Sequence, residues 1–382
     1  MEPVFFRWND DRRKLKDIDG YFIPGGFSYE DRGRSGMVAA RDSLMEFIGS
    51  EAQQGKVVIG ICNGAQVLVE SGLIPHAQGL QMSLARNAVS MNGKMQGLPL
   101  LSEWIWITRS CSKDRCATSG WDGVMQIPIA HGEGRFTTRD QNLFQELKKN
   151  DQIAFSYCDA LGNVSTDPAV TPNGSMLAIA GICNPQGNVI ALMPHPERAQ
   201  GNGDVYFASM KEWIETKRTA SAGLRPAAKM PTMPVSQDRT SVPARAPTEN
   251  TEIFIETIIT NNEERTVEQA ARRVAPTLRL KQWKYLSVPQ SAVKKVLADL
   301  TVFNANKERA FIKKGRDPTG FIEGKTVLIR REIPDTGAAA WEKGSETGIA
   351  YGIEGISDQE LCSKKLLEVF ANPHASTLER LP

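Results

Sequence analysis

Residues 57–66 read VVIGICNGAQ, and this stretch constrains the fold more than any other part of the chain. An apolar, β-branched run that closes on Gly60 is typical of a buried strand, and the residues after it are typical of a helix. We therefore expect Cys62 on the tight turn between them, with its side chain in open space. A nucleophile elbow presents its reactive residue in the same way.

The position of Cys62 ahead of a helix has a chemical consequence. The partial positive charge at a helix N-terminus favours a thiolate over a thiol. A cysteine after an apolar strand is more often an inert core residue, but the flanking glycines favour the elbow. The pattern predicts that Cys62 is a nucleophile.

Composition narrows the class of protein. The 382 residues suit two domains, and a formal net charge of +2 indicates neither a nucleic acid nor an anionic membrane as partner. The chain has no apolar run of 18 residues and no hydrophobic signal-peptide region near Met1. We expect a cytoplasmic protein whose six cysteines are free thiols.

A glycine pair precedes the Cys62 segment. A predicted strand over residues 18–24 runs into PGGFSYEDRGRSG, residues 24–36. Gly25 and Gly26 allow a close backbone approach or a positive φ, with N–H groups free to face a developing oxyanion. A flexible surface turn is the alternative. A predicted helix over residues 38–48 then leads back to the Cys62 strand, in the βαβ order of a parallel sheet.

Further motifs follow in a fixed order: LARNA at 84–88, IPIAHGEGRF at 127–136 and a long stretch ending in MPHPER at 198. With PGGFSYEDRGRSG and GICNGAQVLVESGLIP, they resemble the class I, triad-type glutamine amidotransferases. The resemblance is greatest to the amidotransferase subunits of phosphoribosylformylglycinamidine synthase, of purine biosynthesis. It implies an α/β, flavodoxin-like, doubly wound sheet.

Amide hydrolysis needs a nucleophile, a base, and a group that orients the base. MPHPER supplies the last two, since His195 and Glu197 are two residues apart. The extended conformation that Pro194 and Pro196 favour directs both side chains to the same face. We predict that these two residues and Cys62 form a catalytic triad.

The resemblance assigns the other site residues. It implies an oxyanion hole made by the backbone N–H groups of Gly26 and Asn63. It also implies glutamine binding by Gly25, Gln66 and Asn87. His131 matches the place where the site of the family opens toward its synthetase partner, although a histidine of the core or of a loop fits that position equally well.

Three other cysteines are predicted to be neither nucleophiles nor metal ligands. Cys183 is followed by Asn-Pro and Gly-Asn turn residues, which predicts a hairpin and a structural thiol. Cys111 and Cys116 have no second pair or neighbouring histidine, so we predict no metal site.

The amino-terminal part departs from the family pattern. Related subunits begin with a strand and a helix that have no counterpart here, and residues 2–8 align with their second strand. Three explanations are open: the start is assigned too late, another segment fills the gap, or the sheet is compromised. We predict an amidotransferase domain over residues 1–216.

The remaining chain divides at a change in composition. Residues 217–250 are rich in Pro, Ala, Ser, Thr and Arg, which predicts a disordered linker. Residues 251–382 predict a small α+β module. Its helices are expected to start at capping boxes, one of Thr266 with Gln269 and one of Ser357 with Glu360. Its tail resembles the small accessory subunit of the same synthase.

We therefore expect glutamine hydrolysis through a Cys62 thioester, with ammonia passed to a separate synthetase subunit. The chain has no GxxxxGK[ST] phosphate loop, so we expect no cofactor here and assign ATP and magnesium to the partner. Two alternatives stay open. One is a non-catalytic assembly scaffold of the same complex, and the other is a cysteine hydrolase of another substrate.

Overall fold

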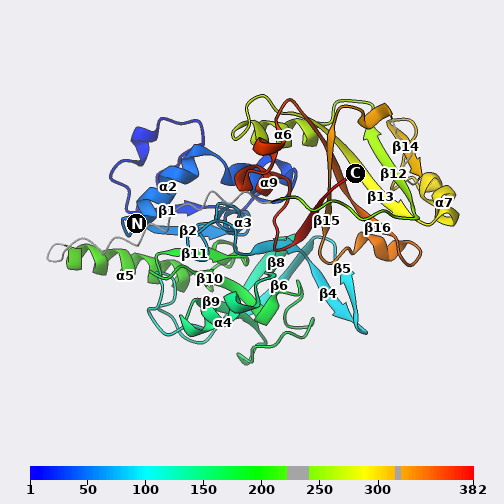
Figure 1. The fold of residues 1–382 in the computed structure, drawn as a ribbon. Helices are drawn as coiled ribbons and strands as arrows, with labels where there is room; N and C mark the ends of the chain where they lie inside the picture. Colours follow the sequence, from blue (N-terminus) through cyan, green and yellow to red (C-terminus); the bar gives the residue numbers. More distant parts are fainter. Residues whose placement is uncertain (222–240, 315–319) are drawn as a thin grey trace. The chain divides into compact units, whose positions relative to one another are not determined.

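The computed structural model describes residues 1–221, 241–314 and 320–382, which form two compact units (Figure 1). Of these residues, the first unit holds 1–90 and 98–221, and the second holds 91–97 with the described residues from 241 onward. No helix within the described ranges is long and apolar enough to cross a membrane.

The first unit is built on a mixed seven-stranded sheet. In spatial order its strands are β1 (Gly20–Ile23), β2 (Val57–Ile61), β11 (Val189–Leu192), β10 (Ile179–Cys183), β9 (Ile153–Cys158), β6 (Leu101–Arg109) and β7 (Val124–His131). The pairs of β1 with β2 and of β2 with β11 are parallel, and the others are antiparallel. The α/β class is confirmed, and its parallel part is the part that carries Cys62.

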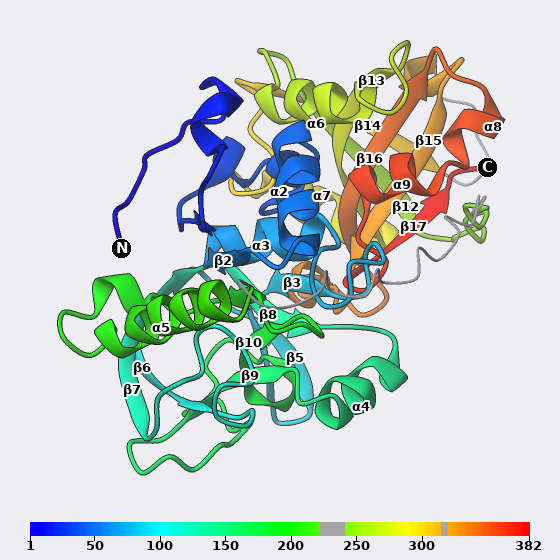
Figure 2. The same ribbon diagram turned by 90° about the vertical axis from the view of Figure 1, so that its left-hand side faces the viewer.

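Helices cover both faces of this parallel part. Figures 1 and 2 show α2 (Ser43–Gln53) and α3 (Asn63–Glu70) on one side and α5 (Asp204–Ser221) on the other. Successive side chains of β1 point to opposite faces of the sheet and contact the helices on each face. Tyr21 donates a hydrogen bond to Glu51 of α2 at 2.7 Å, and the ring of Phe22 lies 6.1 Å from that of Phe207 on α5.

The single helix predicted over residues 38–48 is wrong, because the chain forms two helices there. α1 (Met37–Ala40) ends before Asp42, whose side chain accepts a hydrogen bond from the backbone N–H of Leu44 at 2.9 Å. Asp42 therefore acts as the N-cap of α2 and breaks the helical pattern.

The strand predicted over residues 2–8 is also wrong. Residues 1–7 have no regular structure, and Val4 and Phe5 are exposed. β1 is the edge of the seven-stranded sheet, and β2 is the strand that pairs with it. A segment without a neighbouring strand cannot satisfy its backbone groups in a ladder, so it does not form a strand.

The other elements between residues 1 and 221 are short. They are η1 (Arg12–Leu15), η2 (Ser28–Asp31), β3 (Ser83–Arg86), β4 (Ala88–Met91), β5 (Lys94–Gly97), β8 (Glu133–Thr137), α4 (Gln141–Lys149), η3 (Met176–Ala178) and η4 (Pro196–Arg198). The hairpin of β10 and β11 confirms the turn predicted after Cys183.

The second unit is an antiparallel sheet with short helices, in agreement with an α+β module. Its strands in spatial order are β14 (Glu308–Lys314), β12 (Thr251–Thr257), β13 (Arg279–Val288), β16 (Glu346–Glu354), β15 (Thr326–Glu332) and β17 (Ser376–Arg380). Its helices are α6 (Asn262–Arg272), η5 (Gln290–Ala292), α7 (Val293–Ala298), η6 (Gly320–Ile322), η7 (Gly337–Ala340), α8 (Asp358–Leu361) and α9 (Lys364–Phe370). Ile253 and Phe254, adjacent on β12, belong to two separate core clusters, so both faces of β12 are buried.

One of the two predicted capping boxes is correct. Ser357 and Glu360 form the box that starts α8. Thr266 lies inside α6 instead, because Asn261 accepts a hydrogen bond from the N–H of Glu264 and starts that helix one turn earlier.

The predicted domain boundaries shift in the structure. α5 continues to Ser221, beyond the predicted end at 216. Residues 241–250 belong to the second unit, where Ala244 bridges Arg380 of β17 and the N–H of Arg245 donates to the Arg380 carbonyl at 2.7 Å. These backbone bonds contradict a disordered linker over residues 241–250. Residues 222–240 lie outside the described ranges.

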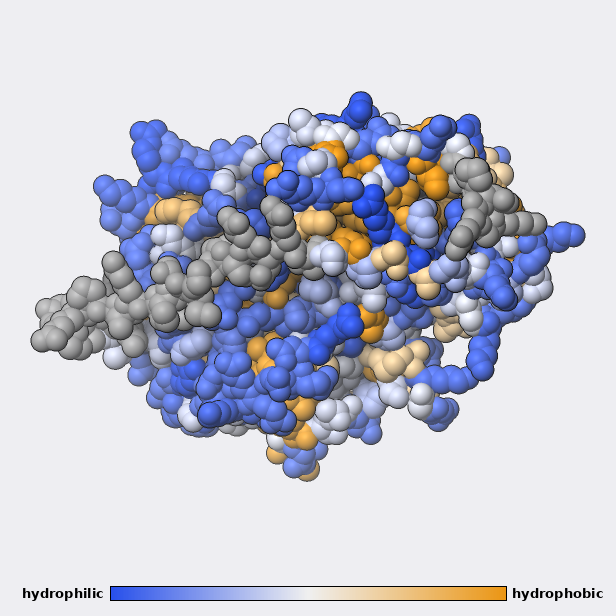
Figure 3. All heavy atoms as spheres, in the orientation of Figure 1, coloured by the Kyte–Doolittle hydropathy of each residue, from blue (hydrophilic) through white to orange (hydrophobic). Residues whose placement is uncertain are grey.

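Most of the surface drawn in Figure 3 is hydrophilic. Hydrophobic residues reach it mainly over elements of the second unit, near α6 and β12. In that unit, Ile258 and Ile259 follow β12 and are 53% and 65% exposed.

Candidate active site

Cys62 occupies a strained turn between β2 and α3. Its backbone angles are φ 50° and ψ −107°, which non-glycine residues rarely adopt. The strand before it is buried along its whole length, and its own N–H donates to the Leu192 carbonyl of β11 at 2.8 Å. The sheet therefore holds Cys62 in the nucleophile-elbow geometry that the sequence predicts.

His195 and Glu197 form the predicted pair. Nδ1 of His195 lies 2.5 Å from Oε1 of Glu197, and the backbone N–H of His195 donates to the Pro128 carbonyl of β7 at 2.9 Å. The His195 ring is fully buried, and its Nε2 has no hydrogen-bond partner among the described residues. The carboxylate fixes one ring nitrogen and leaves the other for a nucleophile.

Gly25 lies close to both the predicted base and the predicted nucleophile. A methyl group placed on its Cα would lie 2.7 Å from Cε1 of His195 and 3.5 Å from Cβ of Cys62. His195 and Cys62 therefore flank the same point of the chain, and any side chain at residue 25 would fill the space between them.

The Cys62 side chain differs from the prediction. It is 4% exposed, and Sγ lies 3.6 Å from the Ala130 carbonyl of β7, so it does not point into open space. Burial raises the pKa of Cys62 to about 12, although the N–H of Asn63 opposes this shift. Desolvation outweighs the helix terminus, and the resting side chain is a thiol rather than the predicted thiolate.

Of the two predicted oxyanion donors, Asn63 lies at the elbow itself. Asn63 is the first residue of α3, and its backbone N–H faces the Cys62 sulfur. Gly26 follows Gly25 with a φ of 146°, a conformation that favours glycine.

Gln66 and Asn87 are buried and already hydrogen-bonded within the protein. The Gln66 side chain donates to the Glu133 carbonyl and accepts from Asn63 at 2.8 Å. The Asn87 side chain donates to the His131 carbonyl at 2.8 Å and accepts from the N–H of Gly134 at 3.1 Å. Both residues shape the β7–β8 turn, and glutamine binding by either one stays a prediction.

His131 ends β7 next to the triad. It is 2% exposed, and neither of its ring nitrogens has a hydrogen-bond partner within the described residues. The ring packs on Gly134, where a methyl group would lie 2.2 Å from it. Burial, with a smaller contribution from His195, lowers the pKa of His131 to about 3, so the ring is neutral near pH 7.

The sequence motifs do not predict the contacts that hold residues 24–36 in place. Arg34 and Glu70 form a buried ion pair, and the Glu133 carboxylate accepts a hydrogen bond from the N–H of Ser35 at 3.0 Å. Glu133 lies inside the HGEGRF motif and could have been singled out there. Arg34 and Glu70 are 36 residues apart and carry no local signal.

All six cysteines are unpaired, and Cys111, Cys116 and Cys183 are buried. Within the described residues, no group of three or more His, Cys, Asp or Glu side chains is arranged to hold a metal ion.

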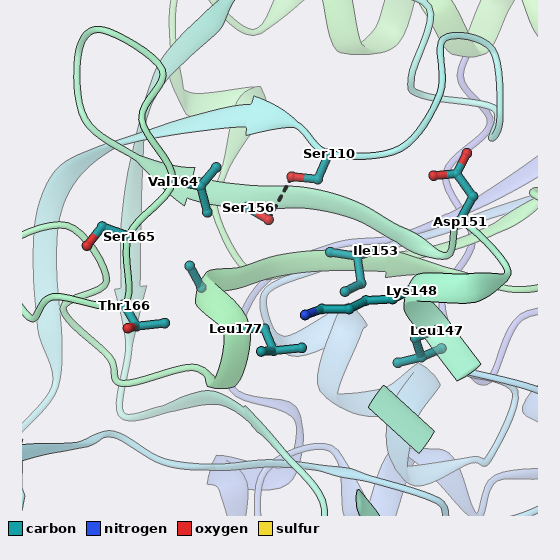
Figure 4. A pocket seen from close by; sticks show the side chains of 11 residues that line it. Ser110, Leu147, Lys148, Asp151, Ile153, Ser156, Val164, Ser165, Thr166 and Leu177 are labelled. Atoms are coloured by element: carbon teal, nitrogen blue, oxygen red, sulfur yellow. Dashed lines mark hydrogen bonds between the residues drawn. The ribbon is translucent and has the colours of Figure 1, made fainter. Parts of the chain in front are cut away.

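A pocket of about 590 Å³ lies elsewhere in the first unit and contains none of the predicted site residues (Figure 4). Ser110 and Ser156 are hydrogen-bonded within it at 2.7 Å. Its other lining residues are Leu147, Lys148, Asp151, Ile153, Val164, Ser165, Thr166, Leu177 and Ala178. Its lining residues include no cysteine or histidine.

A buried cysteine on an elbow, close to a histidine that binds a carboxylate, is the arrangement that a triad amidohydrolase requires. The family model of the CobB/CobQ-like glutamine amidotransferase domain matches residues 3–224, and the chain belongs to this family. The predicted amidotransferase class is thus confirmed.

Two relatives and one solved structure are similar to this chain. The "phosphoribosylformylglycinamidine synthase subunit PurQ" of Methanothrix thermoacetophila is 39% identical over 57% of this chain and 90% of its own length. The subunit of the same name from Saccharolobus solfataricus is 41% identical over 49% of this chain and 76% of its own. A chain in the structure of PurLQS from Thermotoga maritima is 31% identical over 56% of this chain and 86% of its own, with a TM-score of 0.43.

Proposed function

We propose that this chain is the glutaminase subunit of a phosphoribosylformylglycinamidine synthase. The observation that carries the proposal is the 2.5 Å contact of His195 with Glu197, next to Cys62 at the elbow. The names of the PurQ relatives support the choice of reaction.

The geometry supports a two-step hydrolysis. Nε2 of His195 takes the proton of the Cys62 thiol, and the sulfur attacks the carboxamide carbon of glutamine. The N–H groups of Gly26 and Asn63 stabilise the tetrahedral oxyanion. The C–N bond then breaks, the histidine returns its proton to the leaving group, and ammonia and a thioester result. Water attacks the thioester in the same way and releases glutamate and the thiol.

The high pKa of the Cys62 thiol fits this sequence of steps. Because burial keeps the resting sulfur protonated, the thiolate forms only as His195 removes the proton. The nucleophile is thus generated against bound substrate rather than maintained in the free protein.

We further propose that ammonia passes to a separate synthetase subunit, which binds ATP and magnesium. The absence of a phosphate-loop motif from the sequence supports this division of labour. A channel-lining role for His131 belongs to the same proposal. A buried imidazole that stays neutral can accept a hydrogen bond from ammonia without protonating it.

The second unit is proposed as an accessory module of the same complex. Its separate core and α+β architecture support an independent role. Co-purification of the full chain with a candidate synthetase tests the assembly. Glutamine turnover with and without that partner then tests the dependence of activity on it.

The substitution Cys62→Ser tests the reaction in the assembled complex. We expect glutamine-dependent synthesis to fall by about 10⁴-fold or more, because the triad loses its thiol nucleophile. Synthesis from added ammonia should stay within about twofold of wild type, since it bypasses the triad. Equal loss with both nitrogen sources would contradict a glutaminase role.

A further inference from the structure

The loop that carries Gly26 is attached to both ends of α3. We call residues 24–36 the oxyanion loop. At the amino end of α3, the Asn63 side chain accepts a hydrogen bond from the N–H of Ser28 at 3.0 Å and donates to Asp31 at 3.3 Å. At its carboxyl end, Glu70 binds Arg34.

The contact between Glu70 and Arg34 is bidentate and buried. Nε of Arg34 donates to Oε1 of Glu70 at 2.9 Å, and Nη2 donates to Oε2 at 2.6 Å. The two side chains are 11% and 4% exposed. Arg41 adds a second positive charge 3.6 Å from the same carboxylate. A bidentate pair fixes direction as well as distance, unlike a solvated ion pair.

The oxyanion loop needs such attachments because its backbone is strained. Tyr29, Glu30 and Asp31 are consecutive and have φ values of 53°, 57° and 53°. Non-glycine residues in this region are unfavourable and persist only where surrounding contacts hold them.

We propose that Glu70 is a positioning residue that holds the oxyanion loop, through Arg34, over the Cys62 thiol. α3 then fixes both halves of the oxyanion hole. Its first residue supplies one N–H donor, and its last residue anchors the loop that supplies the other, at Gly26. This inference rests on the proposed glutaminase function and adds to it a residue that touches neither substrate nor thiol.

The substitution Glu70→Gln keeps the shape of the side chain and removes its charge. In the assembled complex, we expect kcat for glutamine hydrolysis to fall by about 10- to 100-fold, less than the loss of about 100- to 1,000-fold when an oxyanion donor is removed outright. KM should change by less than about threefold, since the donor acts on the transition state. The substitution Arg34→Lys, which keeps the charge but not the fork, should give an intermediate loss.

A matched control lies in the same loop. Glu30 forms an ion pair with Arg32 at 2.8 Å, but its side chain is 77% exposed. Glu30→Gln makes the same chemical change at the surface and should leave kcat within about twofold of wild type.

A second readout separates positioning from a general loss of structure. Iodoacetamide alkylates a thiol without an oxyanion hole, so its rate at Cys62 should not fall in Glu70→Gln. Hydrogen exchange of the Ser28 and Ser35 amides, which the structure places in hydrogen bonds, should become faster. These two measurements do not depend on glutamine turnover.

Different results would contradict the proposed glutaminase function and the positioning role of Glu70. A wild-type complex that fails to hydrolyse glutamine contradicts the proposed function, and the exchange data still decide the role of Glu70. A Glu70→Gln variant with wild-type kcat, or with unchanged exchange at both amides, overturns the positioning role. So does a variant whose alkylation rate falls together with kcat. If Glu70→Gln does not fold, Arg34→Lys answers the same questions.

Discussion

At the scale of single residues, the proposed site depends on three side chains and on a glycine, which has no side chain, at position 25. In the proposed mechanism, Cys62, His195 and Glu197 supply the nucleophile, base and orienting carboxylate, and the Cα of Gly25 lies close to both Cys62 and His195. The motifs predict all four positions. They do not predict that Cys62 is buried, because its sulfur contacts Ala130, which is distant in sequence.

Gly25→Ala tests this packing. The added methyl group would lie 2.7 Å from the His195 ring, so the ring must move away from Cys62. We expect glutamine hydrolysis to fall by about 100-fold or more, as for other displacements of about 1 Å in an active site. Steady-state kinetics measures the loss. Gly320→Ala, where nothing lies within 4 Å, is the control, and equal activity of the two variants would contradict the packing argument.

The pH dependence of Cys62 alkylation tests its environment. Because burial raises the pKa of Cys62 to about 12, the rate with iodoacetamide should climb about tenfold per pH unit through pH 10, without a plateau near 9. Quenched reactions read by peptide mass spectrometry give the rates. A plateau between pH 7 and 8 would indicate a resting thiolate paired with His195 and would contradict the thiol.

The same pKa shift predicts a trend in stability. The unfolded chain releases the Cys62 proton above about pH 9, whereas the folded chain holds it up to about pH 12. The contribution of this group to the free energy of unfolding is therefore complete below pH 9 and is lost as the pH rises from 9 to 12. Urea titrations of wild type and Cys62→Ala at pH 8 and pH 10 measure it, and the two proteins should differ less at pH 10.

At the scale of elements, the β2–α3 elbow is the best predicted part of the fold. An apolar strand, a glycine-flanked turn and a helix are all local signals, and each occurs as expected. The break between α1 and α2 was not predicted, because the apolar spacing allows one longer helix and does not show that Asp42 caps a new one. The start of α6 was predicted too late, because the capping role of Asn261 was not recognised. The left-handed residues 29–31 contain no glycine and have no sequence signal.

Gly64→Ala tests how closely α3 packs on the sheet. A methyl group at Gly64 would lie 2.0 Å from the Ile23 carbonyl oxygen of β1, and backbone atoms cannot move aside cheaply. We expect a loss of about 3 kcal/mol or more in the free energy of unfolding. Gly49→Ala in α2 is the control, since its nearest neighbour is a flexible Leu73 side chain at 3.1 Å. A Gly64 variant as stable as the Gly49 variant would show that α3 does not lie this close.

At the scale of the whole molecule, the chain is two units with separate cores. Composition predicts the division, but not that residues 241–250 join the second unit. The reason is Arg245, which is 7% exposed and pairs with Glu346 and, at 2.9 Å, with Glu379. A single arginine within a polar stretch does not reveal carboxylates more than 100 residues away.

Arg245→Ala should therefore destabilise the second unit. It removes one of the two guanidinium groups that bind Glu346 and Glu379, since Arg331 stays paired with both carboxylates. A lost hydrogen bond to a charged group costs about 1.5–3 kcal/mol. Chemical denaturation followed by hydrogen exchange assigns the loss to one unit, with Cys62 alkylation unchanged. Arg309→Ala, 64% exposed and 3.8 Å from Glu256, is the control and should be within about 0.5 kcal/mol of wild type. Equal stability of the two variants would contradict the anchoring role.

Covalent labelling by a glutamine analogue with an electrophilic side chain tests the central claim most directly. The full chain, in complex with its synthetase, is treated with the reagent and analysed by peptide mass spectrometry. We expect one label, on Cys62 alone among the six cysteines, and protection by added glutamine. A label spread over several cysteines, none on Cys62, or one that glutamine does not compete for would contradict a glutaminase site at the elbow.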